Sequence, residues 1–133
     1  MIDIENRIID TLIDKLRAEF GDIYVYGEVP ELAAGYPCVT VMEMNNSIAA
    51  HHIDSGGYEN AVDLMYEVTV YSDLTRGKKE QAKKIRSFIS DVLTQMGFVR
   101  TLSQPVPDLN NAAVYRIVSR FEARADGIGI YRR

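Results

Sequence analysis

The chain has 133 residues, and a chain of this length buries about two-thirds of its unfolded surface, which is enough for one domain with a core. Its 15 basic and 19 acidic residues give a net charge of −4, which argues against nucleic-acid binding through bulk charge. The single cysteine, Cys38, excludes an internal disulfide and favours a reducing compartment. The first residues carry the acids Asp3 and Glu5 rather than a basic region followed by an apolar block, and no run reaches about 18 apolar residues. We therefore expect neither a secretory signal nor a membrane-spanning segment.

The first predicted element is a helix. Asp3 or Asn6 is placed to cap its start, and Gly21 is placed to end it. A short strand is predicted over 23–26, and a loop over 27–35 follows it. The apolar residues of the helix recur at three- and four-residue steps and form one stripe, which consists of Ile8, Ile9, Leu12, Ile13, Leu16 and Phe20.

A second strand is predicted to begin at Pro37, because the first position of a strand tolerates a missing backbone N–H. Alternating apolar residues carry this strand to Met44. From 45 to 60 no period is sustained, so we expect a long loop, which in a compact domain is usually functional or disordered. Its large aliphatic residues are Ile48 and Ile53. With so few apolar anchors, the segment is expected to be a mobile arm that orders on a neighbouring subunit.

A strand followed by a long amphipathic helix forms the predicted centre of the fold. Asp73 or Thr75 is placed to cap the helix, which is predicted over 75–96, and Gly97 is placed to end it. We expect the helix to cover the apolar face of the strand. That face consists of Val62, Leu64, Tyr66, Val68 and Val70, and the helix stripe consists of Ala82, Ile85, Ile89, Val92, Leu93 and Met96.

The remaining segments are predicted to complete one sheet. A short strand is expected over 99–103, a turn-rich connection over 104–111, a long strand over 114–125 and a last short strand over 128–131. The order α-β-β-β-α-β-β predicts an α+β fold in a single domain spanning 1–133. In it, a mainly antiparallel sheet carries both helices on one face.

Basic residues crowd the first turns of the second helix. Cations at this position oppose the helix dipole, at a cost of about 0.3–1 kcal/mol each when exposed. Two interpretations stay open: a solvated helix face, or a docking patch for an acidic protein surface or a phosphate. The residues are Arg76, Lys78, Lys79, Lys83 and Lys84.

A row of arginines is predicted on the last long strand. Arg116, Arg120 and Arg124 recur every four residues, so they line one face at steps of about 13 Å. If both helices cover the opposite face, the arginine face is open. It is then either an ordinary solvated face with cross-strand partners such as Asp63 or Glu67, or a subunit interface or channel lining.

No set of residues forms a recognisable catalytic or metal-binding pattern. His51, His52 and Asp54 have no second cluster of ligands at a metal-site spacing. Cys38 lies in an apolar strand, where a free cysteine usually behaves as a small buried hydrophobe. We therefore expect no enzymatic activity, no metal and no cofactor.

The arrangement resembles the tail-completion proteins of long-tailed bacteriophages and prophages, which are also called tail terminator or head–tail joining proteins. The similar stretches cover nearly the whole chain and are patterns of fold and turn. They are Tyr36–Val41, Leu64–Ser72, Thr75–Gly97, Phe98–Thr101, Pro105–Asn110 and Tyr115–Val118.

The resemblance implies a structural subunit without catalytic residues. Such a subunit forms a ring, often a hexamer, at the tail end or the head–tail junction, and meets the tail-tube and head-connector proteins. It implies assembly in the bacterial cytoplasm and a place in the virion. The alternatives from the residues are a small ligand-binding or enzymatic α+β domain, which needs a pocket with converging polar groups, and a nucleic-acid-binding module, which the net charge disfavours.

Overall fold

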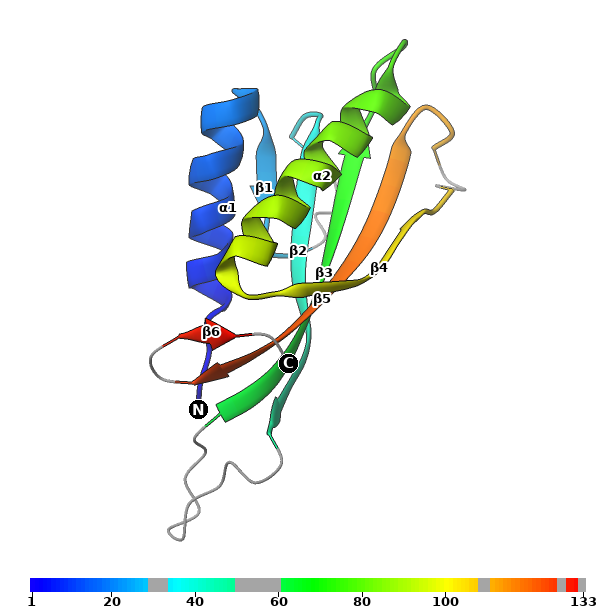
Figure 1. Cartoon of the computed structure of the whole chain (residues 1–133). Helices are drawn as coiled ribbons and strands as arrows, with labels where there is room; N and C mark the ends of the chain where they lie inside the picture. The colour runs from blue at the N-terminus through cyan, green and yellow to red at the C-terminus, as the bar shows by residue number, and fades with distance from the viewer. Residues whose placement is uncertain (29–33, 50–60, 108–110, 127–128, 132–133) are drawn as a thin grey trace, which may run out of the picture.

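The computed structural model describes residues 1–28, 34–49, 61–107, 111–126 and 129–131 (Figure 1). Its elements follow the expected α-β-β-β-α-β-β order, and the short strand predicted over 128–131 is present at Ile130–Tyr131, so the predicted α+β class is confirmed. In chain order they are α1 (Glu5–Phe20), β1 (Tyr24–Tyr26), β2 (Cys38–Ile48), β3 (Ala61–Ser72), α2 (Lys78–Met96), β4 (Val99–Pro105), β5 (Tyr115–Asp126) and β6 (Ile130–Tyr131).

The strands form one sheet in the order β1-β2-β3-β5-β4, and β6 pairs with the end of β5. All pairs are antiparallel except β1 with β2, which is parallel, so the sheet is mainly antiparallel as predicted. Because β5 inserts between β3 and β4, the β3–α2–β4 unit is a split β-α-β arrangement. Figure 1 shows both helices on the same face of the sheet, which leaves the other face without a helical cover.

The core lies between the helices and the sheet face they cover. The predicted apolar face of β3 is fully buried, and so are five of the six residues of the predicted α2 stripe, while Met96 is half-buried. Two aromatic pairs pack edge to face in this core. Tyr66 of β3 meets Phe98, which follows α2, at 5.9 Å between ring centroids, and Phe20 of α1 meets Phe88 of α2 at 5.4 Å, which connects the two helices. On β5 the residues on the face opposite the arginines are buried as well, namely Ile117, Ser119, Phe121 and Ala123.

The helix starts differ from the sequence prediction. Ile4 occupies the N-cap position of α1 without a side-chain cap, although Asp3 Oδ1 accepts the Glu5 N–H at 3.0 Å. The predicted cap at Asn6 is wrong, because that residue lies inside the helix. Both helices end where expected, at Gly21 and Gly97, and Gly97 has a left-handed φ of 110°.

The predicted start of α2 at Thr75, capped by Thr75 or Asp73, is also wrong. The helix begins at Lys78, and Gly77 stands at the N-cap position with a φ of 82°. At that φ a side chain would be strained, so the glycine determines where the chain can turn into the helix. The Gly77 carbonyl accepts the first helical bond, from the Gln81 N–H at 2.9 Å.

The predicted loop over 45–60 begins too early, because β2 continues to Ile48. A β-bulge at Met44 explains the error: Glu43 lies opposite Tyr66, whereas Asn45 lies opposite Met65. The extra residue shifts the side-chain alternation by one, so the sequence pattern ends although the strand does not. Ile53 and the rest of the predicted arm beyond Ala49 lie outside the described residues.

A second bulge, at Thr101, makes β4 longer than predicted. Arg100 lies opposite Phe121 and Leu102 lies opposite Arg120, so Thr101 is the additional residue. The strand then continues through Gln104 to Pro105, two residues beyond its predicted end at Ser103.

Candidate functional site

The open face of the sheet carries the predicted arginine row, and two of its members are paired. Arg120 Nε donates to Glu67 Oε2 at 3.0 Å, and Arg124 Nε donates to Asp63 Oδ1 at 2.9 Å. In each pair, the arginine on β5 lies directly opposite its acidic partner on β3. The cross-strand partners considered from the sequence, Asp63 and Glu67, are therefore confirmed. These arginines stabilise the pairing of the two central strands.

The third arginine has another role. Arg116 Nε donates to the Val106 carbonyl at 3.3 Å, and Arg116 Nη2 donates to the Pro107 carbonyl at 3.0 Å. The Val106 N–H donates in return to the Arg116 carbonyl at 2.9 Å. Arg116 thus fixes the chain that follows β4, and the three arginines do not form a uniform row.

Acidic and basic residues are mixed on the central strands of the open face. On the described part of this face, β5 contributes Glu122 and Asp126 as well as its three arginines, and β3 contributes Asp63 and Glu67. The side-chain exposure of Arg120 is 42% and that of Glu67 is 23%. A face of this kind has no net positive charge to attract a polyanion, so it suits contacts with another protein better than contacts with a nucleic acid.

The basic residues at the start of α2 are available for contacts. Arg76, Lys79, Lys83 and Lys84 are exposed and Lys78 is half-buried. Among the described residues, none of these five cations pairs with a carboxylate. Their charge is therefore not neutralised within that part of the chain.

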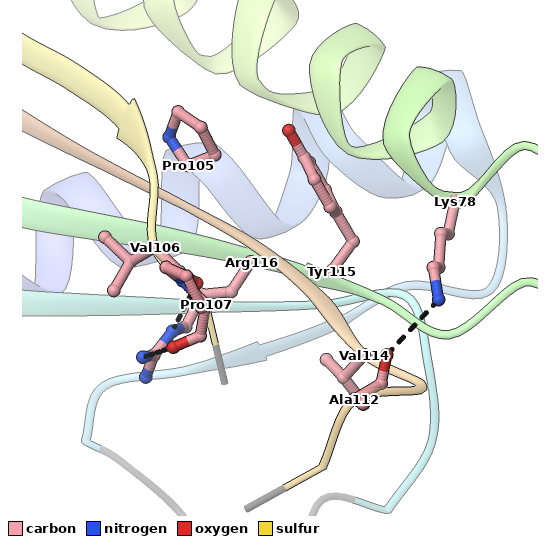
Figure 2. Close-up of a pocket in the computed structure, with 8 residues that line it drawn as sticks. All are labelled: Lys78, Pro105, Val106, Pro107, Ala112, Val114, Tyr115 and Arg116. Atoms are coloured by element: carbon pink, nitrogen blue, oxygen red, sulfur yellow. Dashed lines mark hydrogen bonds between the residues drawn. The ribbon is translucent and has the colours of Figure 1, made fainter. Parts of the chain in front are cut away.

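A cavity of about 520 Å³ lies beside Lys78, between the start of α2 and the facing ends of β4 and β5 (Figure 2). Lys78 Nζ lies 3.4 Å from the carbonyl oxygens of both Ala112 and Ala113. Figure 2 shows the Lys78 ammonium reaching toward Ala112, while the Arg116 guanidinium turns toward Val106 and Pro107. The lining is mostly apolar and consists of Pro105, Val106, Pro107, Ala112, Val114 and Tyr115, with Lys78 and Arg116.

Sequence reasoning did not identify this cavity. Lys78 and Arg116 are both candidate interface residues. They lie 38 positions apart in the chain, and the fold brings both to the same cavity. The signal in the sequence was the Pro105–Pro107 segment, which was interpreted only as a turn. Its place opposite the helix start depends on the order of β4 and β5 in the sheet, which local patterns do not reveal.

A second cluster that the sequence did not predict is acidic. Asp3, Glu5 and Glu43 each place a carboxylate oxygen within 4.8 Å of the others. Burial, and then the charges of Glu43 and Asp3, raise the pKa of Glu5 above its usual value. Glu43 accepts hydrogen bonds from the Tyr66 hydroxyl at 3.0 Å and from Asn46 Nδ2 at 3.4 Å. The two donors stabilise the Glu43 carboxylate, and the N-terminus of α1 favours negative charge nearby. We therefore do not assign the cluster as a metal site.

Cys38 is buried, as expected for an inert thiol. Burial, with a smaller contribution from the Asp73 carboxylate, raises the pKa of Cys38 to about 11. The thiol therefore stays protonated at neutral pH, which is unfavourable for a nucleophile. His51, His52 and Asp54 lie outside the described residues.

Ile48, the remaining described candidate for an interface, is 46% exposed at the end of β2. It pairs with Val62 of β3, so it belongs to the β2–β3 hairpin. Met44, at the bulge of the same strand, is 47% exposed.

No helix in the described part of the chain combines the length and apolar character needed to cross a membrane.

No protein-family model matches the chain, and no curated protein matches it. Solved structures do match, among them a chain of the "Virion of native gene transfer agent (GTA) particle". The likeness covers 93% of this chain and 95% of that one, with a TM-score of 0.66 and 18% sequence identity. At this identity the comparison shows a shared fold over nearly the full length of both chains.

Proposed function

We propose that this protein is a structural subunit of a bacteriophage, a prophage or a related particle. The observation that carries the proposal is the end-to-end likeness in fold to a chain of the gene transfer agent virion. The coverage of 93% and 95% supports equivalence of whole subunits rather than of one shared motif. The resemblance of the sequence to tail-completion proteins is a separate argument for the same class. On this proposal the protein resides in the virion after assembly in the bacterial cytoplasm.

Within the particle, the proposed role is a ring at the tail end or the head–tail junction, with the tail-tube and head-connector proteins as neighbours. The proposed contacts are the open face around Arg120 and Arg124 and the exposed Ile48, together with Ile53. A ring, including a hexamer, requires two different complementary surfaces on each subunit. The two proposed surfaces are the open face and the basic start of α2, with Arg76, Lys78 and Lys79. Acidic residues on the open face would complement these cations on a neighbouring subunit.

Native mass spectrometry with negative-stain electron microscopy tests this role. The proposal expects closed rings whose mass is a multiple of the subunit mass, either with the protein alone or after addition of isolated tail tubes. When isolated tail tubes are added, the protein is expected to bind them at one end, whatever the length of the tube. A protein that remains a monomer at high concentration and does not bind tail tubes would contradict the proposal.

The alternative function, a small ligand-binding domain, has the cavity beside Lys78 in its favour. Its volume of about 520 Å³ falls within the usual range for ligand pockets. Its described lining offers few polar side-chain groups, however, since Arg116 is engaged by the carbonyls of Val106 and Pro107. A metabolite site usually has several converging polar groups, so this arrangement favours an apolar guest.

A further inference from the structure

The cavity beside Lys78 combines an apolar interior with a cation at its edge. Its volume is large enough for a large apolar side chain, and apolar residues dominate its lining. Apolar anchors that enter such pockets contribute much of the free energy in protein–protein recognition. The interior therefore selects an aliphatic or aromatic group.

Lys78 supplies the second requirement. Its ammonium group has three donors, and two of them are directed at the carbonyls of Ala112 and Ala113 over a long distance of 3.4 Å each. Carbonyl groups do not neutralise a positive charge. Neither Lys78 nor its neighbours Arg76 and Lys79 pairs with a carboxylate within the described ranges. A guest with a negative charge next to its apolar group would complement this edge.

The walls of the cavity are preorganised. Arg116 binds the carbonyls of Val106 and Pro107, and the Val106 N–H binds back to the Arg116 backbone. Pro105 and Pro107 have fixed φ angles, which reduces the number of conformations this segment can adopt. A preorganised wall loses little conformational entropy when a guest binds.

We propose that this cavity is a docking site for a peptide segment of a partner protein, in which a large apolar side chain is followed by a carboxylate. A phosphate fits less well, because the apolar lining offers few donors to its oxygens. The proposal goes beyond the structural role in a particle and does not depend on it, because peptide binding can be measured on the isolated subunit.

The test uses two synthetic peptides that differ only in charge, Ac-Gly-Leu-Asp-Gly-NH2 and Ac-Gly-Leu-Asn-Gly-NH2, and the full chain. Binding is followed by NMR chemical shifts of the Val106, Ala112 and Val114 methyl groups. We expect the Asp peptide to bind roughly two- to fivefold more tightly than the Asn peptide, since an exposed ion pair contributes modestly. Added salt should reduce this difference.

Three variants complete the test. Lys78→Met keeps the apolar stem and should abolish the preference for the Asp peptide, whereas the matched control Lys84→Met should retain it. Ala112→Phe, at an exposed position, should fill the cavity and abolish binding of both peptides while the fold stays intact by circular dichroism. Equal binding of the two peptides, or a preference that survives in Lys78→Met, would overturn the proposal. Shifts of the same methyl groups with protein concentration alone would assign the cavity to a second copy and also overturn it.

Discussion

Arg120 and Glu67 lie directly opposite each other on β5 and β3, with Arg120 Nε 3.0 Å from Glu67 Oε2. The same geometry recurs between Arg124 and Asp63 along the two strands. Arg120, a candidate for a subunit contact, therefore has a partner within its own sheet. This changes what a substitution at Arg120 measures, because the monomer as well as the assembly should respond.

Arg120→Glu places two carboxylates opposite each other. We expect the free energy of unfolding to fall by about 1 kcal/mol or less, because the pair is partly exposed and like charges repel across strands. Urea denaturation measures this change. The double variant Arg120→Glu with Glu67→Arg should recover most of the lost stability. If the face forms a subunit contact, the double variant should assemble less well than the wild type despite its recovered stability; unchanged rings would exclude Arg120 from the contact.

Ile89→Ala should lower the free energy of unfolding by about 2–5 kcal/mol, because Ile89 is buried at 1% exposure and truncation leaves a cavity. Chemical denaturation followed by circular dichroism measures the change. Gln95→Ala is the matched control, since Gln95 is exposed on the same helix and its removal should change stability by less than about 0.5 kcal/mol. A value near zero for Ile89→Ala would mean that the helix presents a different face to the sheet.

The Cys38 thiol should react slowly with thiol reagents in the native protein. Its pKa is raised from 9.0 to about 11, so at pH 8 the native thiol has roughly a hundredfold less thiolate than an ordinary one. The raised pKa also makes the free energy of unfolding depend on pH. The stabilising contribution of the protonated Cys38 is fully present below pH 9 and is lost as the pH rises toward 11, because the thiol of the unfolded chain releases its proton at a lower pH than the native thiol. Labelling kinetics and alkaline denaturation measure the two effects. A Cys38→Ala variant should show a shallower alkaline loss of stability.

The β2–β3 hairpin divides the segment that was predicted as an arm. Asn45–Ile48 pairs with Val62–Met65, so amides bonded in this ladder should exchange slowly even in a dilute monomer. For residues 50–60 the prediction remains fast exchange in the monomer and protection in the assembled ring. Hydrogen exchange with mass spectrometry resolves the two parts. Equal exchange across the whole of 45–60 in the monomer would contradict the division.

The sequence predicted the elements with strong periodicity and failed where the period is interrupted. The apolar stripes of α2 and β3 leave little choice of which face is buried, because turning either element would expose a whole row of apolar residues. The bulges at Met44 and Thr101 break the alternation without ending the strand, so local patterns place the strand ends too early. The start of α2 depends on the left-handed backbone of Gly77, which side-chain capping rules do not consider.

The candidate sites were predictable only where residues face each other along paired strands. The acids opposite Arg120 and Arg124 followed from the strand pattern, because cross-strand neighbours share a face. The cavity beside Lys78 and the cluster of Glu5 with Glu43 join segments far apart in the chain. Their formation depends on strand order and helix placement, which periodicity alone does not specify.

The bulge at Met44 makes this position tolerant of a change in chain length. Deleting one residue from the regular part of β2 would turn every later side chain to the opposite face, so that Asn45 and Ser47 would enter the core side. Deleting Met44 itself would instead convert the bulge into a regular ladder and keep Asn45–Ile48 in register with β3. Among homologous chains, single-residue gaps in this strand should therefore concentrate at the bulge.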